Sequence, residues 1–67
     1  MYVKVVELVG ESPDNWNDAV QQAISEASTQ IENINGVEVC NLTANVEKGN
    51  LIEYKANVKI AYTDHKI

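Results

Sequence analysis

The sequence predicts an α+β fold in which a strand, one long helix and two further strands follow one another. Three observations lead to this order. Only residues 16–34 space their apolar side chains with helical period. Residues 2–9 are rich in valine and leucine, as strands are. Residues 37–47 and 51–62 alternate apolar and polar side chains around Lys48-Gly49-Asn50, which favours a β-hairpin.

The apolar residues of the predicted helix fall three or four positions apart, so they share one stripe of its surface. They are Trp16, Ala19, Val20, Ala23, Ile24, Ala27, Ile31 and Ile34. The remaining side chains of this stretch are polar and are expected to face water, so the strands must bury the stripe. Ser12 is the expected N-cap and Pro13 the first helical residue. Gly36 suits a left-handed C-cap after a helix that ends at Ile34 or Asn35.

The first strand is apolar on both of its faces. One face holds Val3, Val5 and Val9, and the other holds Tyr2, Val6 and Leu8. A strand of this kind is covered on both faces, and a single helix covers only one, which indicates a partner chain. The chain is expected to form one domain, residues 1–67, with a marginal core. Its only cysteine, Cys40, excludes an internal disulfide, so oligomerisation remains as the way to enlarge that core.

The hairpin register follows from the apolar pattern. If Glu47 faces Leu51 across a three-residue loop, every pair on one face is apolar. These pairs are Val46 with Ile52, Ala44 with Tyr54, Leu42 with Ala56, and Cys40 with Val58. The same register places Thr43 beside Lys55, and Asn45 beside Glu53, on a polar face that nothing in this chain covers. Val37 and Val39 lie on the polar phase, which predicts a bulge or bend near the start of this strand, and residues 63–67 read as a loose tail.

The composition excludes several classes of function. A net charge of −5 disfavours binding to nucleic acid, which needs clustered lysine and arginine. No apolar run is long enough to cross a membrane, and no signal-peptide pattern begins the chain, so a cytoplasmic location is expected. One cysteine and one histidine are too few for a zinc-type site within one chain. The sequence has no nucleophile with a nearby histidine, no phosphate-binding loop and no metal motif, so it is not expected to be an enzyme.

Several stretches together resemble the dodecins, a family of small proteins that assemble as hollow dodecamers and bind flavins. The resemblance runs from Val3 to Tyr62. It is carried by Lys4-Val5-Val6-Glu7-Leu8-Val9-Gly10, Ser12-Pro13, Trp16 to Ala19, Asn33 to Val39, and Ile52-Glu53-Tyr54-Lys55. The resemblance implies a three-stranded antiparallel sheet that partly wraps one long helix, a homododecamer, and flavin sites between subunits.

Three positions depart from the flavin-binding pattern of that family. Many dodecins have a tryptophan just before the second strand, on which the flavin ring stacks, and the matching residue here is Gly36. Many have a glutamine on the last strand at the polar edge of the ring, and the matching residue is Lys55. Some bacterial members carry an arginine near the phosphate, for which Thr43 is the nearest match. These three residues are the candidate ligand-binding positions.

Two of these residues also allow a purely structural interpretation. Lys55 either forms a surface ion pair with Glu53 or Glu38, or donates to a carbonyl or phosphate of a ligand. Gly36 is either the helix C-cap or an emptied stacking position. Three further residues are given packing or surface roles: Trp16 at the helix end or a subunit contact, Cys40 in the core, and His65 in a solvated tail.

The leading hypothesis is a homododecameric protein, not an enzyme, that binds and stores riboflavin or FMN through a weakened or altered site. The alternative is a structural dodecameric shell without flavin binding. In both cases acidic side chains can gather at symmetry axes, where calcium or another divalent cation would relieve their repulsion.

Overall fold

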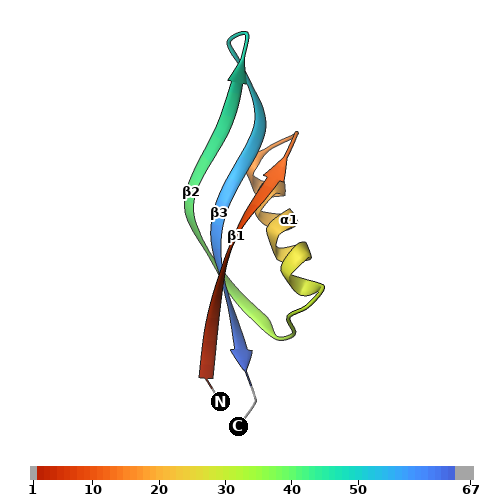
Figure 1. The fold of residues 1–67 in the computed structure, drawn as a ribbon, viewed down its shortest axis with the longest axis vertical. Coiled ribbons are helices and arrows are strands. Elements are labelled where there is room, and N and C mark those ends of the chain that lie inside the picture. Colours follow the sequence, from red (N-terminus) through yellow and green to blue (C-terminus); the bar gives the residue numbers. More distant parts are fainter. Residues whose placement is uncertain (1, 65–67) are drawn as a thin grey trace.

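The computed structural model describes residues 2–64 and confirms the predicted order of elements. The elements are β1 (Tyr2–Ser12), α1 (Trp16–Ser28), β2 (Ile34–Glu47) and β3 (Asn50–Asp64). The strands form one antiparallel sheet in the order β1-β3-β2, and α1 lies against one face of it (Figure 1). The β2–β3 hairpin extends beyond the helix, and the molecule measures 53 × 19 × 12 Å.

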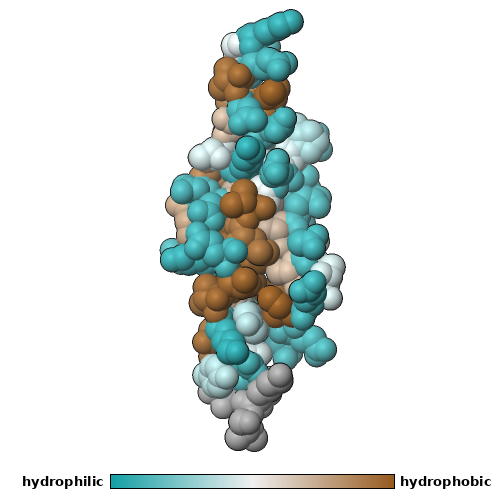
Figure 2. Space-filling view, viewed as in Figure 1, coloured by the Kyte–Doolittle hydropathy of each residue, from teal (hydrophilic) through white to brown (hydrophobic). Residues whose placement is uncertain are grey.

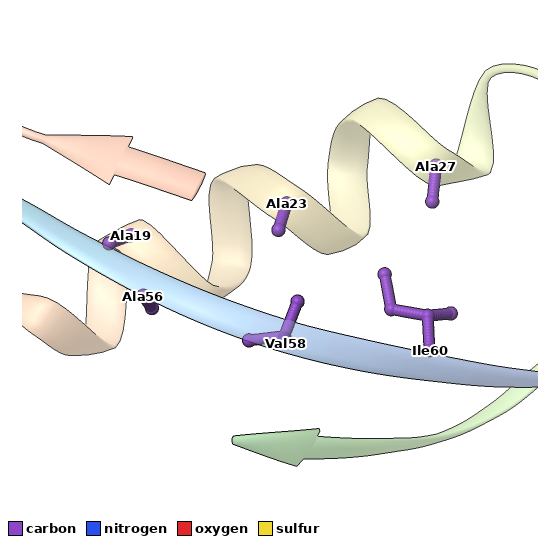
Figure 3. Packing of buried hydrophobic residues seen from close by; sticks show 6 residues of the cluster. All are labelled: Ala19, Ala23, Ala27, Ala56, Val58 and Ile60. Atoms are coloured by element: carbon purple, nitrogen blue, oxygen red, sulfur yellow. The ribbon is translucent and has the colours of Figure 1, made fainter. Parts of the chain in front are cut away.

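The core lies between α1 and the central strand β3. Its buried members are Ala19, Ala23 and Ala27 on the helix and Ala56, Val58 and Ile60 on β3 (Figure 3). These are the faces that the apolar patterns predict for both elements. Four further predicted helix-stripe residues pack against this core while half-buried: Val20, Ile24, Ile31 and Ile34. The burial therefore confirms the predicted faces of the helix and of the last strand.

The backbone of strand β1 lies close against the helix at Gly10. A Cβ atom at this position would collide with the carbonyl oxygen of Ala19 and lie 3.0 Å from the Cβ of Ala23. Because glycine has no Cβ, the backbone of β1 can approach the helix backbone here. This contact fixes how near the helix lies to the edge of the sheet.

The predicted N-cap is wrong, because Asn15 rather than Ser12 caps α1. The side chain of Asn15 accepts a hydrogen bond of 2.7 Å from the backbone N–H of Asp18. Ser12 instead ends β1, where it is buried and donates to the Asp18 carboxylate over 2.7 Å. Its hydroxyl oxygen also accepts from the backbone N–H of Asp14, at 3.0 Å. Pro13 therefore lies in the turn before the helix and not at its first position.

The predicted C-terminus of the helix is also wrong. The helix ends at Ser28 with Thr29 as its C-cap, and the hydroxyls of these two residues donate to the carbonyl oxygens of residues 24 and 26. Such side-chain bonds compete with the helical ladder. The chain then turns at Asn33, whose φ of 62° lies in the left-handed region that asparagine tolerates. Gly36 is consequently a residue of β2 and not a helix cap.

The hairpin turn has two residues and not the predicted three. Lys48 and Gly49 have φ of 53° and 80°, as a type I′ turn requires, and Glu47 pairs with Asn50. This shifts the pairs nearest the turn by one residue from the prediction, so that Val46 faces Leu51. A bulge at Glu53, whose φ is 49°, restores the predicted register. From that point Ala44 faces Tyr54, Thr43 faces Lys55 and Leu42 faces Ala56.

A second bulge lies where the apolar pattern of β2 changes phase, as predicted. Val39 faces Val58 and Asn41 faces Asn57, so Cys40 is the extra residue between them. The predicted pairing of Cys40 with Val58 and its core position are therefore wrong, and this thiol is exposed. The bulge turns Val39 to the helix side of the sheet, opposite the buried Val58.

The last strand continues further than predicted. Thr63 and Asp64 belong to β3 and pair with Val3 and Tyr2 of β1, so these two residues are not part of a loose tail. The carboxylate of Asp64 forms an ion pair with Lys4 at 3.2 Å. The hydrogen bond to Asp64 is the main reason that the pKa of Lys4 is raised above 10.5. The predicted tail position of His65 lies outside the described residues.

Candidate functional site

The sheet has one face towards the helix and one face away from it, which we call the open face. Since Ala56, Val58 and Ile60 point towards α1, the intervening β3 residues Lys55, Asn57, Lys59 and Ala61 belong to the open face. The β1 residues opposite them include Val5 and Val9, which are 60% and 61% exposed, and Val3 beside them is 61% exposed. Figure 2 shows one side of the molecule, where apolar side chains form a band at mid-length and a second group near the hairpin tip.

Thr43 and Lys55 lie side by side on the open face, as the sequence predicts. They are direct partners in the β2–β3 register, and Glu11 of β1 is the partner of Lys55 on its other side. Side chains in such cross-strand positions have Cβ atoms about 4.5–5.5 Å apart. Lys55 is half-buried and Thr43 is exposed. These two side chains, which we call the Thr43–Lys55 row, therefore offer a cationic donor and a hydroxyl that both donates and accepts.

The alternative partners considered for Lys55 have other neighbours. The register sets Glu38 opposite Lys59, and Glu53 accepts a hydrogen bond from Asn45 at 3.3 Å. The predicted pairing of Asn45 with Glu53 is wrong in register, since Asn45 faces Ile52, but the two side chains are neighbours as predicted. The carboxylate opposite Lys55 in the register is Glu11, on β1, whose pairing with β3 was not predicted from the sequence.

Asn57 also belongs to the open face of the sheet. It follows Lys55 by two residues, so the two side chains share a face. Its Oδ1 atom is buried and has no hydrogen-bond partner among the described residues. A buried acceptor without a donor costs about 1–3 kcal/mol. Asn57 is not among the candidate residues predicted from the sequence, although its position on the polar phase of the last strand indicates this face.

Gly36 lies far from Thr43 and Lys55 within one chain. It faces Ala61, which is six residues beyond Lys55 on β3, or roughly 20 Å at the rise of a strand. A Cβ atom built on Gly36 would meet only the Cβ of Ala61, at 3.8 Å. Gly36 forms the floor of an open concavity of about 580 Å³ together with Val5, Glu38, Lys59 and Ala61. One chain therefore does not bring the three candidate residues together.

Trp16 supports the Thr43–Lys55 row from the helix side, a contact that the sequence did not predict. Its indole N–H donates a hydrogen bond of 2.8 Å to the carbonyl oxygen of Thr43. Its ring meets the ring of Tyr54 edge to face, with centroids 4.9 Å apart and planes at 83°. Trp16 thus contacts one candidate residue directly and the residue that precedes the other.

Within residues 2–64 the acidic side chains do not converge on a metal-sized site. Among residues 2–64 no group of three or more histidine, cysteine, aspartate or glutamate side chains is close enough to hold a metal ion. On the open face, the register sets Lys59 between Glu7 and Glu38, so an acidic residue flanks the lysine on each side. The structure likewise describes no helix that is long and apolar enough to cross a membrane within residues 2–64.

Comparison with known proteins identifies the family. Residues 2–64 match the family model described as Dodecin. A calcium dodecin from Mycobacterium tuberculosis is 24% identical over 59 residues, which cover 88% of this chain and 83% of that protein. The solved dodecin from Streptomyces coelicolor superposes with a TM-score of 0.92 and 26% identity, over 98% of this chain and 94% of that one.

A second solved structure is a calcium dodecin from Mycobacterium tuberculosis, described as having a novel calcium-binding site. It is similar to this chain with a TM-score of 0.83 and 22% identity, over 97% of this chain and 93% of that one. This second likeness concerns the fold. The family match runs from the first to the last described residue, and the sheet and helix superpose on those of a solved dodecin. This chain therefore belongs to the dodecin family.

Proposed function

We propose that this protein is a homododecamer that binds and stores a flavin, riboflavin or FMN, and is not an enzyme. The observation that carries the proposal is the pairing of Thr43 with Lys55 on the open face of the sheet. Family membership supports the class of ligand. The altered residues at positions 36, 43 and 55 indicate that the ligand is held differently from the usual family pattern.

The exposed valines of β1 support assembly. Three of them, Val3, Val5 and Val9, lie on the open face with about three-fifths of their surface in contact with water. Burial of apolar surface contributes about 25 cal/mol per Å², so covering these three valines by another subunit is favourable. Val37, Val39 and Leu42 add apolar surface on the helix side of β2, which the helix leaves partly uncovered. Both faces of the sheet thus have apolar surface for a neighbour.

The polar groups of the open face suit the polar edge of a flavin ring. That edge carries carbonyl oxygens on either side of an N–H group. Lys55 supplies a donor for a carbonyl of that edge. Thr43 adds a hydroxyl next to Lys55. Glycine at position 36 gives no ring for stacking, so the affinity of the parent protein is expected to be low.

A second candidate function is a structural shell that is stabilised by divalent cations. It is favoured by the net charge of −5 and by the similarity to a protein named calcium dodecin. Calcium takes six to eight oxygen ligands. Since residues 2–64 of one chain hold no such group of acidic side chains, the ligands would come from several subunits at their contacts. In this case the open face would hold no flavin.

A fluorescence-quenching titration of riboflavin and of FMN with the assembled protein tests the proposal. The expected result is saturable quenching that weakens about tenfold or more in Lys55→Met, because a hydrogen bond from a charged group is lost. Lys48→Met is the matched control, since it removes the same charge at the hairpin turn. Quenching by neither flavin, together with saturable calcium binding in calorimetry, would replace the first function by the second.

A further inference from the structure

Trp16 is the one aromatic residue of the helix, and its contacts converge on the two strands that carry the candidate site. The hydrogen bond to the Thr43 carbonyl spans 2.8 Å and joins residues that are 27 positions apart in the sequence. The ring contact to Tyr54 reaches the residue before Lys55. One indole therefore touches β2 and β3 at the same row of the sheet, on the side opposite the open face.

We infer that Trp16 is a positioning residue for the Thr43–Lys55 row. The inference rests on the proposed function only in naming a flavin as the probe. Alternate residues of a strand point to opposite faces, so a side chain that holds Tyr54 on the helix side fixes the direction of Lys55 on the open face. Holding the carbonyl of Thr43 fixes the backbone of the partner strand at the same level.

The backbone next to the Thr43–Lys55 row is irregular in both strands, which gives a fixed contact there a role. Glu53 lies immediately before Tyr54 and forms the bulge, with a φ of 49° that costs a side chain such as glutamate energy. The register changes by one residue between Ala44 and Asn45, one residue beyond Thr43. Without a fixed contact beside them, the two strands could exchange the bulge for a neighbouring register. Trp16 contacts both strands beside this bulge, at Thr43 and at Tyr54, on the side of the bulge where Lys55 lies.

The helix end that carries Trp16 is itself firmly held. Asn15 caps the helix, and the Ser12 hydroxyl binds the Asp18 carboxylate at 2.7 Å. Ala19, the residue after Asp18, is fully buried against the sheet. The indole is thus attached to a part of the helix that these contacts restrain, which suits it to hold a hairpin that extends beyond the helix (Figure 1).

The test compares Trp16→Phe with Val20→Ala in the assembled protein. The first variant removes the N–H donor and keeps a ring near Tyr54. The second removes two methyl groups from a half-buried helix residue and serves as the control for general loss of packing. Hydrogen exchange measured by mass spectrometry is expected to speed up over residues 41–46 and 52–57 in Trp16→Phe, and to stay unchanged there in Val20→Ala.

The same variants are titrated with FMN. Loss of the indole hydrogen bond is expected to weaken FMN binding about 2- to 10-fold, with Val20→Ala unchanged. Unchanged exchange in Trp16→Phe, or an equal increase in Val20→Ala, overturns the inference. Faster exchange with unchanged FMN affinity also overturns it, because Trp16 would then support the fold alone. If the parent binds no flavin, the proposed function fails, and the exchange measurement alone decides the role of Trp16.

Discussion

Replacing Gly36 by tryptophan tests whether the open face retains a place for a flavin ring. The structure removes the main objection to this change. Gly36 lies in β2 and is absent from the residues with positive φ, and a Cβ atom added to it would meet only the Cβ of Ala61, at 3.8 Å. The backbone strain of about 1–2 kcal/mol that a left-handed residue would add is therefore absent. Tryptophan is also a favourable residue in strands.

The expected gain follows from ring stacking. Stacking of a planar base on an aromatic side chain contributes about 1–3 kcal/mol in nucleic-acid complexes. If the same value holds for a flavin, Gly36→Trp tightens riboflavin binding by about 5- to 150-fold. Adding Lys55→Gln is expected to give a smaller further gain, because an amide both donates and accepts at the polar edge of the ring.

The assay is riboflavin fluorescence quenching on the assembled protein, with the particle size checked by light scattering. Gly36→Leu is the control, because leucine fills the same concavity without a ring to stack. Gly36→Trp should bind riboflavin more tightly than both the parent and Gly36→Leu. If Gly36→Trp assembles as the parent does and its affinity is unchanged, the reasoning is refuted and the pocket is closed or rebuilt. The flavin function would then give way to the structural shell.

Three further predictions concern stability. Gly10→Ala should destabilise the protein by about 1–3 kcal/mol in chemical unfolding, because the new Cβ meets a helix carbonyl, while Gly36→Ala should be nearly neutral. Val20→Asp places an unpaired charge against the core and should abolish the assembled particle in light scattering. Asn17→Asp, on the exposed side, should change stability by less than about 0.5 kcal/mol, and equal effects would refute the helix face. The raised pKa of Lys4 means that its ion pair stabilises the fold below the unfolded pKa of 10.5 and is lost as the pH rises through the higher folded value. Unfolding on both sides of pH 10.5 should therefore show a loss of stability in the parent that Lys4→Met lacks.

The sequence predicts the faces of the elements better than their ends. The helix face was correct because alanines at positions 19, 23 and 27 repeat at every turn and face the core. The end of the helix was wrong because Ile31 and Ile34 continue the same spacing after the helix stops. Both pack against the same core from the loop and from β2, so burial, not helical geometry, keeps them apolar.

The start of the helix shows a different limit of sequence reasoning. Ser12 and Asn15 are both good capping residues, and the sequence offers no rule to choose between them. The choice depends on where β1 ends, since pairing with Tyr54 keeps Ser12 in the sheet. The predicted core position of Cys40 was wrong for a similar reason. The bulge was predicted from the valines before it, but which residue bulges depends on the pairing of the whole hairpin.

The candidate site was predictable where it depends on register and not where it depends on distant contacts. Thr43 and Lys55 were placed together because the apolar pairs of the other face leave little choice. The predicted turn length was wrong, yet the pairing at the site was right, because the bulge at Glu53 compensates for the shorter turn. The contact of Trp16 with Thr43 was not predictable, since it depends on where the helix lies over the hairpin.

The division of the sheet into two faces explains how a dodecin can keep its fold and change its ligand residues. The buried core involves Ala56, Val58 and Ile60, which face the helix and cannot change without loss of packing. Thr43 and Lys55 point the other way, and a Cβ atom at Gly36 would meet only the Cβ of Ala61, at 3.8 Å. A substitution at these three positions alters the chemistry of the open face at little cost to the single-chain fold. Similarity of fold therefore constrains the core strongly and the ligand weakly, so the ligand must be tested on the side chains of the open face.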